Sequence, residues 1–301
     1  MADTRILVVG GAGQVARALT EAEAPEGIHV IARGRPQLDI LDAACIDAAL
    51  DDVSPRLVVN AAAYTAVDQA ESDQAACTAL NVDAPGALAA ATARRGIPII
   101  HLSTDYVFDG SKEGPYVETD LVAPLGVYGR SKLVGEGRVA AANPAHVILR
   151  TAWVYSPFGK NFVKTMLRVG AGRDELGVVH DQRGNPTSAA DIADGILTVA
   201  TRLLSGDPAA PAGIYHMTAG GEASWAEFAE HIFACSAEVG GPVARVKRIT
   251  TAEYPTPVKR PANSRLACGQ LKQTFGVALP DWRDSTRTCV NRLFKTREWE
   301  A

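Results

Sequence analysis

The sequence has few cysteines, few aromatic residues and no long hydrophobic run. Its five cysteines are scattered along 301 residues, with no CxxC pair and no Cys/His spacing typical of a metal site. Aromatic residues make up 6% of the chain. The apolar runs are only strand length, which excludes a membrane-spanning helix. Together these absences exclude a disulfide-stapled secreted domain, and they predict a protein with no metal.

Charge of neither sign is concentrated in one place. The chain has 30 Lys and Arg against 34 Asp and Glu, a net charge of −4, and no basic block. Nucleic acid is therefore excluded as an expected partner. The length suffices for one large or two moderate domains. The first residues lead into a strand-like segment without a signal-peptide pattern, and with reduced thiols this predicts a cytoplasmic location.

A glycine turn follows the first strand-like segment. Residues 5–9 form a strand-like run that is apolar and largely β-branched after Arg5. Gly10 and Gly13 come next with Gln14 and Val15, and a helical pattern follows. Strand, glycine turn and helix form the context of a dinucleotide fingerprint, in which the pyrophosphate meets a helix N-terminus. The alternative is a glycine turn without a ligand.

The second strand, residues 28–32, ends beside two arginines. An acidic residue normally binds the ribose of NAD at this place, but Arg33 and Arg35 stand here instead. A guanidinium suits a 2′-phosphate, so the sequence favours NADPH, with NADH as the alternative. Asp39 and Ile40 follow and are predicted to reach the adenine.

Two further strands end in residues suited to a ligand. Residues 57–60 run into Ala61, Ala62 and Ala63, whose small side chains let a cofactor lie against the backbone or let a helix pack closely. Residues 97–102 run into Ser103 and Thr104. Hydroxyls at such a strand end can donate to a substrate carbonyl, or they can serve a turn or cap.

A tyrosine and a lysine stand four residues apart in Tyr128-Gly-Arg-Ser-Lys132. On a helix this spacing places both side chains on one face, about 6 Å apart along the axis. A phenol titrates near 10, and a neighbouring ammonium favours its ionised form. The pair is therefore expected to exchange a proton with a substrate, with Lys132 lowering the pKa of Tyr128.

Strand-like and helical segments alternate through the first half of the chain. This pattern predicts an α/β fold with a Rossmann-type doubly wound parallel sheet in residues 1–155. Residues 187–220 are expected to return to that domain, and residues 156–301 to form mainly a smaller substrate-binding lobe. Helices are expected at residues 64–76, 80–94, 128–142, 161–170, 189–204, 225–238 and 264–275.

Several motifs resemble one known family. They are Gly10-x-x-Gly13, Ser-Thr104-Asp-Tyr-Val-Phe-Asp-Gly110, Tyr128-x-x-x-Lys132, Asn60-Ala-Ala-Ala-Tyr-Thr-Ala-Val-Asp68, Arg150-Thr-Ala-Trp153-Val-Tyr155, Asp181-Gln-Arg-Gly-Asn-Pro-Thr187 and Arg260-Pro-Ala-Asn-Ser264. In this order they resemble the extended short-chain dehydrogenase/reductases, and within them the dTDP-4-dehydrorhamnose reductase family. The resemblance spans about residues 4 to 290.

The resemblance implies an activity and a set of roles. It implies NADPH-dependent reduction of the C4 ketone of a dTDP-4-dehydro sugar, the last step of dTDP-L-rhamnose synthesis. Tyr128 would protonate the C4 oxygen, Lys132 would lower its pKa and hold the nicotinamide ribose, Thr104 would donate to the carbonyl, and Trp153 would lie against the sugar. The remaining predicted substrate contacts are Val67, Tyr106, Asn161, Gln182 and Arg260.

Two features qualify the resemblance. Ser156 stands where the family often has glycine, which affects local loop shape. The glutamates through which some relatives bind magnesium between subunits have no identified counterpart here, so no metal is predicted; a homodimer is compatible with the sequence.

Other functions belong to the same superfamily. A nucleotide-sugar epimerase or dehydratase is one alternative, although Thr104 is followed by Asp105 and Tyr106 and not by the acid pair that dehydratases usually have. A non-catalytic regulatory subunit, like that of methionine adenosyltransferase, is the other alternative.

Overall fold

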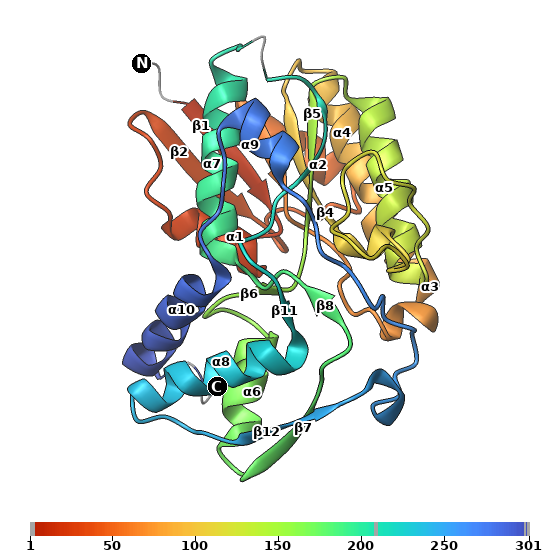
Figure 1. Cartoon of the computed structure of the whole chain (residues 1–301). Coiled ribbons are helices and arrows are strands. Elements are labelled where there is room, and N and C mark those ends of the chain that lie inside the picture. Colours follow the sequence, from red (N-terminus) through yellow and green to blue (C-terminus); the bar gives the residue numbers. More distant parts are fainter. Residues whose placement is uncertain (1–3, 208–209, 298, 300–301) are drawn as a thin grey trace.

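A six-stranded parallel sheet forms the centre of the molecule in the computed structural model, which describes residues 4–207, 210–297 and 299. The strand order is β10-β5-β4-β3-β1-β2 (Figure 1). The strands of this sheet are β1 (Thr4–Val9), β2 (Ile28–Arg33), β3 (Leu57–Asn60), β4 (Ile99–Thr104), β5 (His146–Thr151) and β10 (Gly213–His216). The order reverses between β1 and β3, and ligands bind at such switch points.

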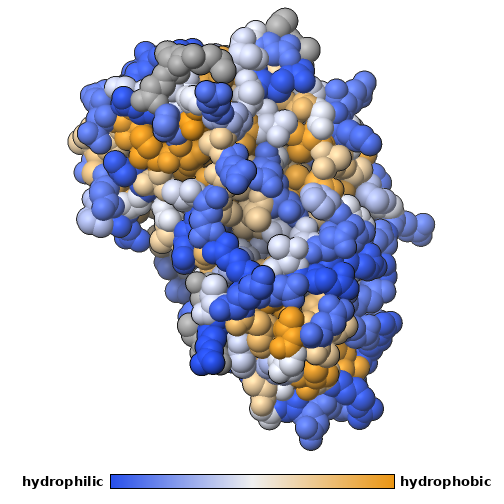
Figure 2. All heavy atoms as spheres, turned by 90° about the vertical axis from the view of Figure 1, so that its left-hand side faces the viewer, coloured by the Kyte–Doolittle hydropathy of each residue, from blue (hydrophilic) through white to orange (hydrophobic). Residues whose placement is uncertain are grey.

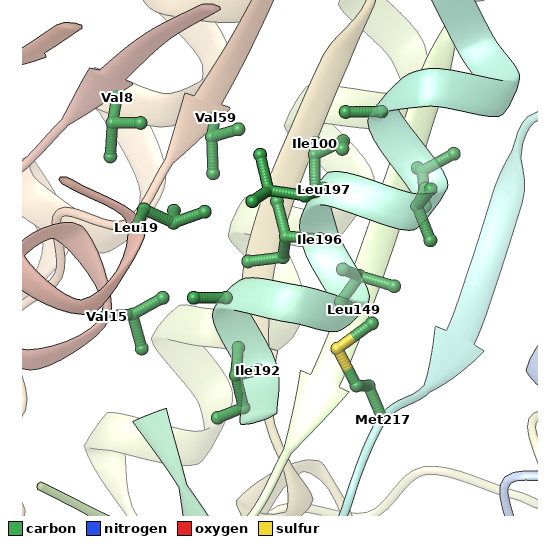
Figure 3. Packing of buried hydrophobic residues seen from close by; sticks show 14 of the residues in the cluster. Val8, Val15, Leu19, Val59, Ile100, Leu149, Ile192, Ile196, Leu197 and Met217 are labelled. Atoms are coloured by element: carbon green, nitrogen blue, oxygen red, sulfur yellow. The ribbon is translucent and has the colours of Figure 1, made fainter. Parts of the chain in front are cut away.

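Both faces of the sheet are covered by helices. Successive side chains of a strand point to opposite faces, so Ile6 and Val8 join one core and Leu7 and Val9 the other. The first face packs on α1 (Gln14–Glu21), α7 (Ala189–Leu204) and α9 (Gly269–Phe275). Figure 3 shows residues of α1 and α7 lying against it. The second face packs on α2 (Ala43–Val53), α4 (Ala84–Ala93) and α5 (Val127–Ala142). The predicted doubly wound sheet is confirmed.

A helix and a strand late in the chain join the main sheet. α7 packs against α1, and β10 pairs in parallel with β5, with Tyr215 opposite Leu149. Both elements lie within residues 187–220, the segment expected to return to the first domain. The domain boundaries themselves stay predictions.

The second lobe lies below the sheet in Figure 1. Its main helices pack on one buried cluster that contains Tyr155, Phe228 and Trp282. Its elements are β6 (Val154–Tyr155), α6 (Phe162–Gly170), β7 (Glu175–Val179), β8 (Arg183–Gly184), β9 (Thr187–Ser188), β11 (Ala223–Ser224), α8 (Trp225–Glu238), β12 (Arg245–Ile249) and α10 (Trp282–Thr296). Ser224 and Glu227 form a capping box at the start of α8.

Two predicted helices are wrong in part. The expected helix at residues 64–76 is an irregular loop up to residue 68, then a short 3-10 turn (Gln69–Glu71) and α3 (Gln74–Thr78). The Asn81 side chain bonds both the N–H and the C=O of Tyr64, the groups that a helix would use. The expected helix at residues 264–275 begins only at Gly269, because the backbone before it pairs with Tyr116 and Arg183. The long helix α10 was not predicted.

Within residues 4–207, 210–297 and 299, no helix is both long and apolar enough to cross a bilayer. The face in Figure 2 is largely hydrophilic, with hydrophobic residues gathered in separate patches in its upper and lower parts.

Candidate active site

The glycine turn lies at the switch point of the sheet, between β1 and α1. Gly10 has a φ of 104°, and a Cβ added there would lie 2.8 Å from the amide nitrogen of Ala62. Only glycine accommodates both the backbone angle and this close approach. Gly13 is the N-cap of α1 and has no side chain to cap it. The first N–H groups of α1 are thus available to an anion.

A cleft of about 740 Å³ opens over this turn. Its lining contains seven of the predicted cofactor residues: Gly10, Gly13, Asp39, Ile40, Ala61, Ala62 and Ala63. Of the two arginines after β2, Arg35 lines the cleft and Arg33 does not. The Arg33 carbonyl instead accepts from the N–H groups of Gly10 and Gly11 at 2.9 and 3.0 Å, which holds the turn in place. The glycine cradle and the cleft fit a dinucleotide.

Two further predicted cofactor residues direct their side chains elsewhere. Val15 is buried in the core between α1 and the sheet. The Gln14 side-chain oxygen accepts from Ser156 Oγ at 2.8 Å and from Asn161 Nδ2 at 3.0 Å. Any contact of these two residues with a cofactor would therefore come from their backbone.

The predicted catalytic residues are brought together by two neighbouring elements. Thr104 ends β4, and Tyr128 and Lys132 lie in the first turns of α5. The hydroxyls of Thr104 and Tyr128 are hydrogen bonded. Thr104 Oγ1 also donates to Asp105 Oδ1 at 2.9 Å and accepts from the Tyr106 N–H at 3.2 Å. Thr104 and Tyr128 thus form one polar group at the carboxyl end of β4, and Lys132 lies one turn beyond Tyr128 on α5.

The expected lowering of the Tyr128 pKa is wrong for this structure. Burial, followed by the Asp105 charge, raises the pKa of the phenol above its ordinary value, against the hydrogen bond with Thr104. Lys132 Nζ donates to the carbonyl of Leu102 at 2.7 Å and lies 3.4 Å from His101 Nε2. Burial lowers the pKa of Lys132 to about 8. Tyr128 therefore keeps its proton at neutral pH, as a proton donor must.

Asn81 contacts α5, the helix that carries Tyr128, and helps to fix its position. It lies in a π-helical turn (Ala79–Asp83), a departure from α-helix that is frequent at functional sites. Its Nδ2 donates to Ser131 Oγ at 3.0 Å as well as to Tyr64. A Cβ at Gly135 of α5 would lie 2.0 Å from the Asn81 carbonyl oxygen, so the two helices touch. Asn81 therefore ties the backbone of Tyr64 to α5.

A second cleft of about 430 Å³ is lined mainly by residues of the second lobe, with Asp68 and Tyr106 from the first domain. Three predicted substrate residues line it: Tyr106, Gln182 and Arg260. The ring of Tyr106 meets that of Tyr128 edge-on at 5.7 Å, which connects this cleft to the catalytic group. Arg260 pairs with Asp68 at 2.7 Å, and Arg260 Nη1 and Asp68 Oδ1 are buried without a partner. The pair thus leaves one donor and one acceptor at the cleft.

The remaining predicted substrate residues have contacts within the protein. Trp153 stacks on Trp225, with ring centroids 3.5 Å apart, and only Trp225 lines the second cleft. Asn161 caps α6 through its Oδ1, and its amide bonds Gln14 and the carbonyls of residues 156 and 158. Val67 is half-buried beside Asp68. Substrate contacts for these three residues stay predictions.

Three residues at the site were not predicted from the sequence: Asp68, Asp105 and Trp225. Asp105 is buried, and burial raises the pKa of its carboxyl to about 6. Its position next to Thr104 is the signal that could have marked it. Asp68, in a loop after a strand end, offers a weaker signal of the same kind. Trp225 offers none, because only the fold brings it onto Trp153.

The search for metal ligands is negative in the part of the chain that the structure describes. No group of three or more His, Cys, Asp or Glu side chains there could hold an ion. The absence of a metal stays a prediction.

A dinucleotide cradle at the switch point of a parallel sheet, with a Thr–Tyr–Lys group beside it, defines a Rossmann-type dehydrogenase/reductase. The family model described as "RmlD substrate binding domain" matches residues 4–295. The chain therefore belongs to this family. It is 51% identical over 286 residues to the dTDP-4-dehydrorhamnose reductase of Sinorhizobium fredii, a match that covers 95% of this chain and 96% of the relative.

Solved structures agree with this assignment. A dTDP-4-dehydrorhamnose reductase from Clostridium acetobutylicum has a TM-score of 0.89 and 37% identity, covering 97% of this chain and 100% of the other. The reductase from Bacillus anthracis, solved in complex with NADP, has a TM-score of 0.88 and 32% identity with the same coverage. The predicted membership of the dTDP-4-dehydrorhamnose reductase family is confirmed.

Proposed function

We propose that this chain reduces the C4 ketone of dTDP-4-dehydro-L-rhamnose to dTDP-L-rhamnose with NADPH. The observation that carries the proposal is the hydrogen bond between Thr104 and Tyr128, whose ring meets that of Tyr106 in the second cleft. A sugar bound in that cleft would lie beside a proton donor. The family membership supports the same chemistry.

The reaction needs a hydride and a proton. NADPH, when bound in the larger cleft, supplies the hydride to the ketone carbon. Negative charge then grows on the ketone oxygen, and Tyr128 donates its phenolic proton to that oxygen. Lys132 is positive below its pKa of about 8, and its charge stabilises the phenolate that results. Each donor that meets this developing charge contributes on the order of 3 kcal/mol.

Thr104 needs one rearrangement to take part. Its single hydroxyl proton is donated to Asp105, so donating to the substrate requires that hydroxyl to rotate. When it rotates, the hydroxyl becomes the second donor to the developing oxyanion. Because Thr104 donates to Asp105, Tyr128 is the donor in the bond between the two hydroxyls. The proposed order is therefore substrate binding, rotation of both hydroxyls toward the ketone oxygen, and then hydride transfer.

NADPH is proposed in preference to NADH. Arg35 lines the cleft beyond the end of β2, where the adenosine ribose lies in Rossmann folds. A guanidinium there suits a 2′-phosphate. Arg33, the other arginine predicted at this place, lies outside the lining, and its backbone carbonyl holds the glycine turn.

We propose a cytoplasmic location, since all five cysteines are free thiols, as expected in a reducing compartment. A homodimer is the assembly we propose to test, by light scattering coupled to gel filtration. No nucleic-acid partner is expected for a chain with a net charge of −4.

The assay that tests the function mixes purified protein with dTDP-4-dehydro-L-rhamnose and either NADPH or NADH. We expect loss of the reduced-nicotinamide absorbance and formation of dTDP-L-rhamnose, with NADPH preferred. No oxidation of either cofactor would overturn the proposal. An epimerase or dehydratase would instead carry tightly bound NAD through gel filtration and need no added cofactor, and a regulatory subunit would bind without turnover.

A further inference from the structure

Glu136 is a buried carboxylate one helical turn beyond Lys132. Both side chains lie on α5, four residues apart and therefore on the same face. Their residues are 1% and 2% exposed. A buried carboxylate needs partners to remain charged, and the proposed reaction gives it no direct part. Its contacts therefore indicate what it does.

The partners of Glu136 come from two strands of the sheet. Arg150 of β5 binds it with both ends of the guanidinium, Nε to Oε1 at 2.9 Å and Nη2 to Oε2 at 2.7 Å. Ser103 Oγ of β4 donates to Oε1 at 2.5 Å. One carboxylate thus joins α5, β4 and β5. Charge-assisted and bidentate bonds of this kind are short and geometrically specific.

This junction lies next to the reacting groups on both α5 and β4. Ser103 is the residue before Thr104, so its bond to Glu136 holds the end of β4 against α5. The other side of α5 is fixed as well, since Gly135 touches the Asn81 carbonyl. The distance between Thr104 on β4 and Tyr128 and Lys132 on α5 therefore depends on how these elements are joined at Glu136.

We propose that Glu136 is a positioning residue, which holds Thr104 and Lys132, on two different elements, at the reacting site. The proposal rests on the proposed reductase function. It assigns Glu136 two separable effects: the placing of Thr104 through Ser103, and the supply of a negative charge one turn from Lys132.

The charge effect follows from what surrounds Lys132. His101 and the Leu102 carbonyl face it from β4, Cys77 from α3, and Tyr128 and Glu136 from its own helix. Burial lowers the pKa of Lys132, and Glu136 opposes that effect. His101 does not add a positive charge, because burial and Lys132 hold its pKa well below the usual range. Glu136 is the carboxylate that keeps Lys132 charged near neutral pH.

Two variants of the full-length chain separate these effects. Glu136→Asp keeps the charge and draws the carboxylate away from Ser103, and Glu136→Gln keeps the length and removes the charge. Each is compared with the same change at Glu230, which pairs with Arg248 on the surface of the second lobe. Thermal unfolding, the KM for substrate, and kcat from pH 6 to 10 are measured for every variant.

Glu136→Asp is expected to lower kcat roughly ten- to a hundredfold with little change in KM, since a displacement of about 1 Å costs this much. The pH at which its kcat falls should stay that of the unmodified chain. Glu136→Gln is expected to move the alkaline fall of kcat to lower pH by on the order of 1 unit. Both Glu230 variants should behave as the unmodified chain.

A junction that only stabilises the fold would lower the unfolding temperature and leave kcat and its pH profile unchanged in both Glu136 variants; that result overturns the inference. Should neither variant fold, Ser103→Ala replaces them: about a tenfold lower kcat with an unchanged pH profile supports it, and an unchanged kcat overturns it. If the unmodified chain itself oxidises no NADPH, the proposed function has failed instead.

Discussion

Thr104 Oγ1 donates its hydrogen bond to Asp105 Oδ1 at a distance of 2.9 Å. The carboxylate that receives it is buried, and burial outweighs its hydrogen bonds with Thr104 and Ser264. A carboxyl in such a place holds its proton more firmly than one in water, and the pKa of Asp105 is raised to about 6. The active site therefore contains an acid that titrates close to the working pH.

Asp105→Asn is expected to stabilise the protein above neutral pH. The folded-state pKa of about 6 lies above the ordinary value of 3.8, so the native chain binds the extra proton between these values. Stability then falls as the pH rises through this window. The asparagine avoids this loss, with a gain of roughly 2–3 kcal/mol at pH 8 and little at pH 4. The measurement is the free energy of unfolding in denaturant at both pH values. An equal change at pH 4 and pH 8 would contradict the raised pKa of Asp105.

Tyr128→Phe is expected to remove the proton donor and leave the cofactor cleft intact. The reduction rate should fall by at least about a hundredfold, since general acids contribute this much. NADPH should bind with unchanged affinity, measured by fluorescence titration. Tyr64→Phe is the control, because Tyr64 bonds Asp73 through its hydroxyl and lies outside the Thr104–Tyr128 pair. Near-normal reduction by the Tyr128 variant would refute its role.

Arg35→Ala is expected to weaken the preference for NADPH over NADH by roughly tenfold, the size of one charge-assisted hydrogen bond. Arg33→Ala should change it less, since Arg33 contributes its backbone carbonyl to the turn and that group survives the substitution. The measurement is kcat/KM with each cofactor. A larger loss of NADPH preference in the Arg33 variant would show that the side chain of Arg33 binds the 2′-phosphate.

Gly10→Ala is expected to abolish dinucleotide binding, because the new Cβ would lie 2.8 Å from the Ala62 nitrogen at a φ of 104°. Gly96→Ala is the matched control. Gly96 also has a positive φ, of 65°, but its added Cβ would meet nothing within 4 Å. The control should lose about 1 kcal/mol of stability and keep its affinity for NADPH. Equal losses of NADPH affinity in both variants would contradict this, because they would mean that backbone strain causes the loss and not the close contact with Ala62.

The sequence pattern predicted helices correctly where local preferences and tertiary packing favour the same structure. α7 and α8 occur at the expected residues, because apolar periodicity and the Ser188 and Ser224 caps favour the same helices. α5 begins one residue earlier than expected. The loop before α3 was mispredicted as helix because the Asn81 side chain occupies the backbone groups of Tyr64. A bond between residues 17 positions apart leaves no local signal.

Some features of the site likewise follow from the local sequence, and others depend on the fold. The glycine turn and the Tyr128–Lys132 spacing are local, so the sequence alone predicts them. The direction of the Tyr128 pKa is not local, since it depends on how deeply the fold buries the phenol and on the charge of Asp105 beside it. The ammonium expected to act on Tyr128 has its hydrogen bond to the Leu102 carbonyl, which only β4 brings within reach.

The sequence by itself determined the sheet, the dinucleotide turn, the Tyr128–Lys132 spacing and the family, because each depends on short patterns of neighbouring residues. The tertiary structure alone decided which arginine faces the cofactor cleft, that Arg260 pairs with Asp68, and that Glu136 joins α5 to two strands. These contacts bring together residues up to 192 positions apart. The free energy of such contacts depends on burial and orientation, which a linear pattern does not contain.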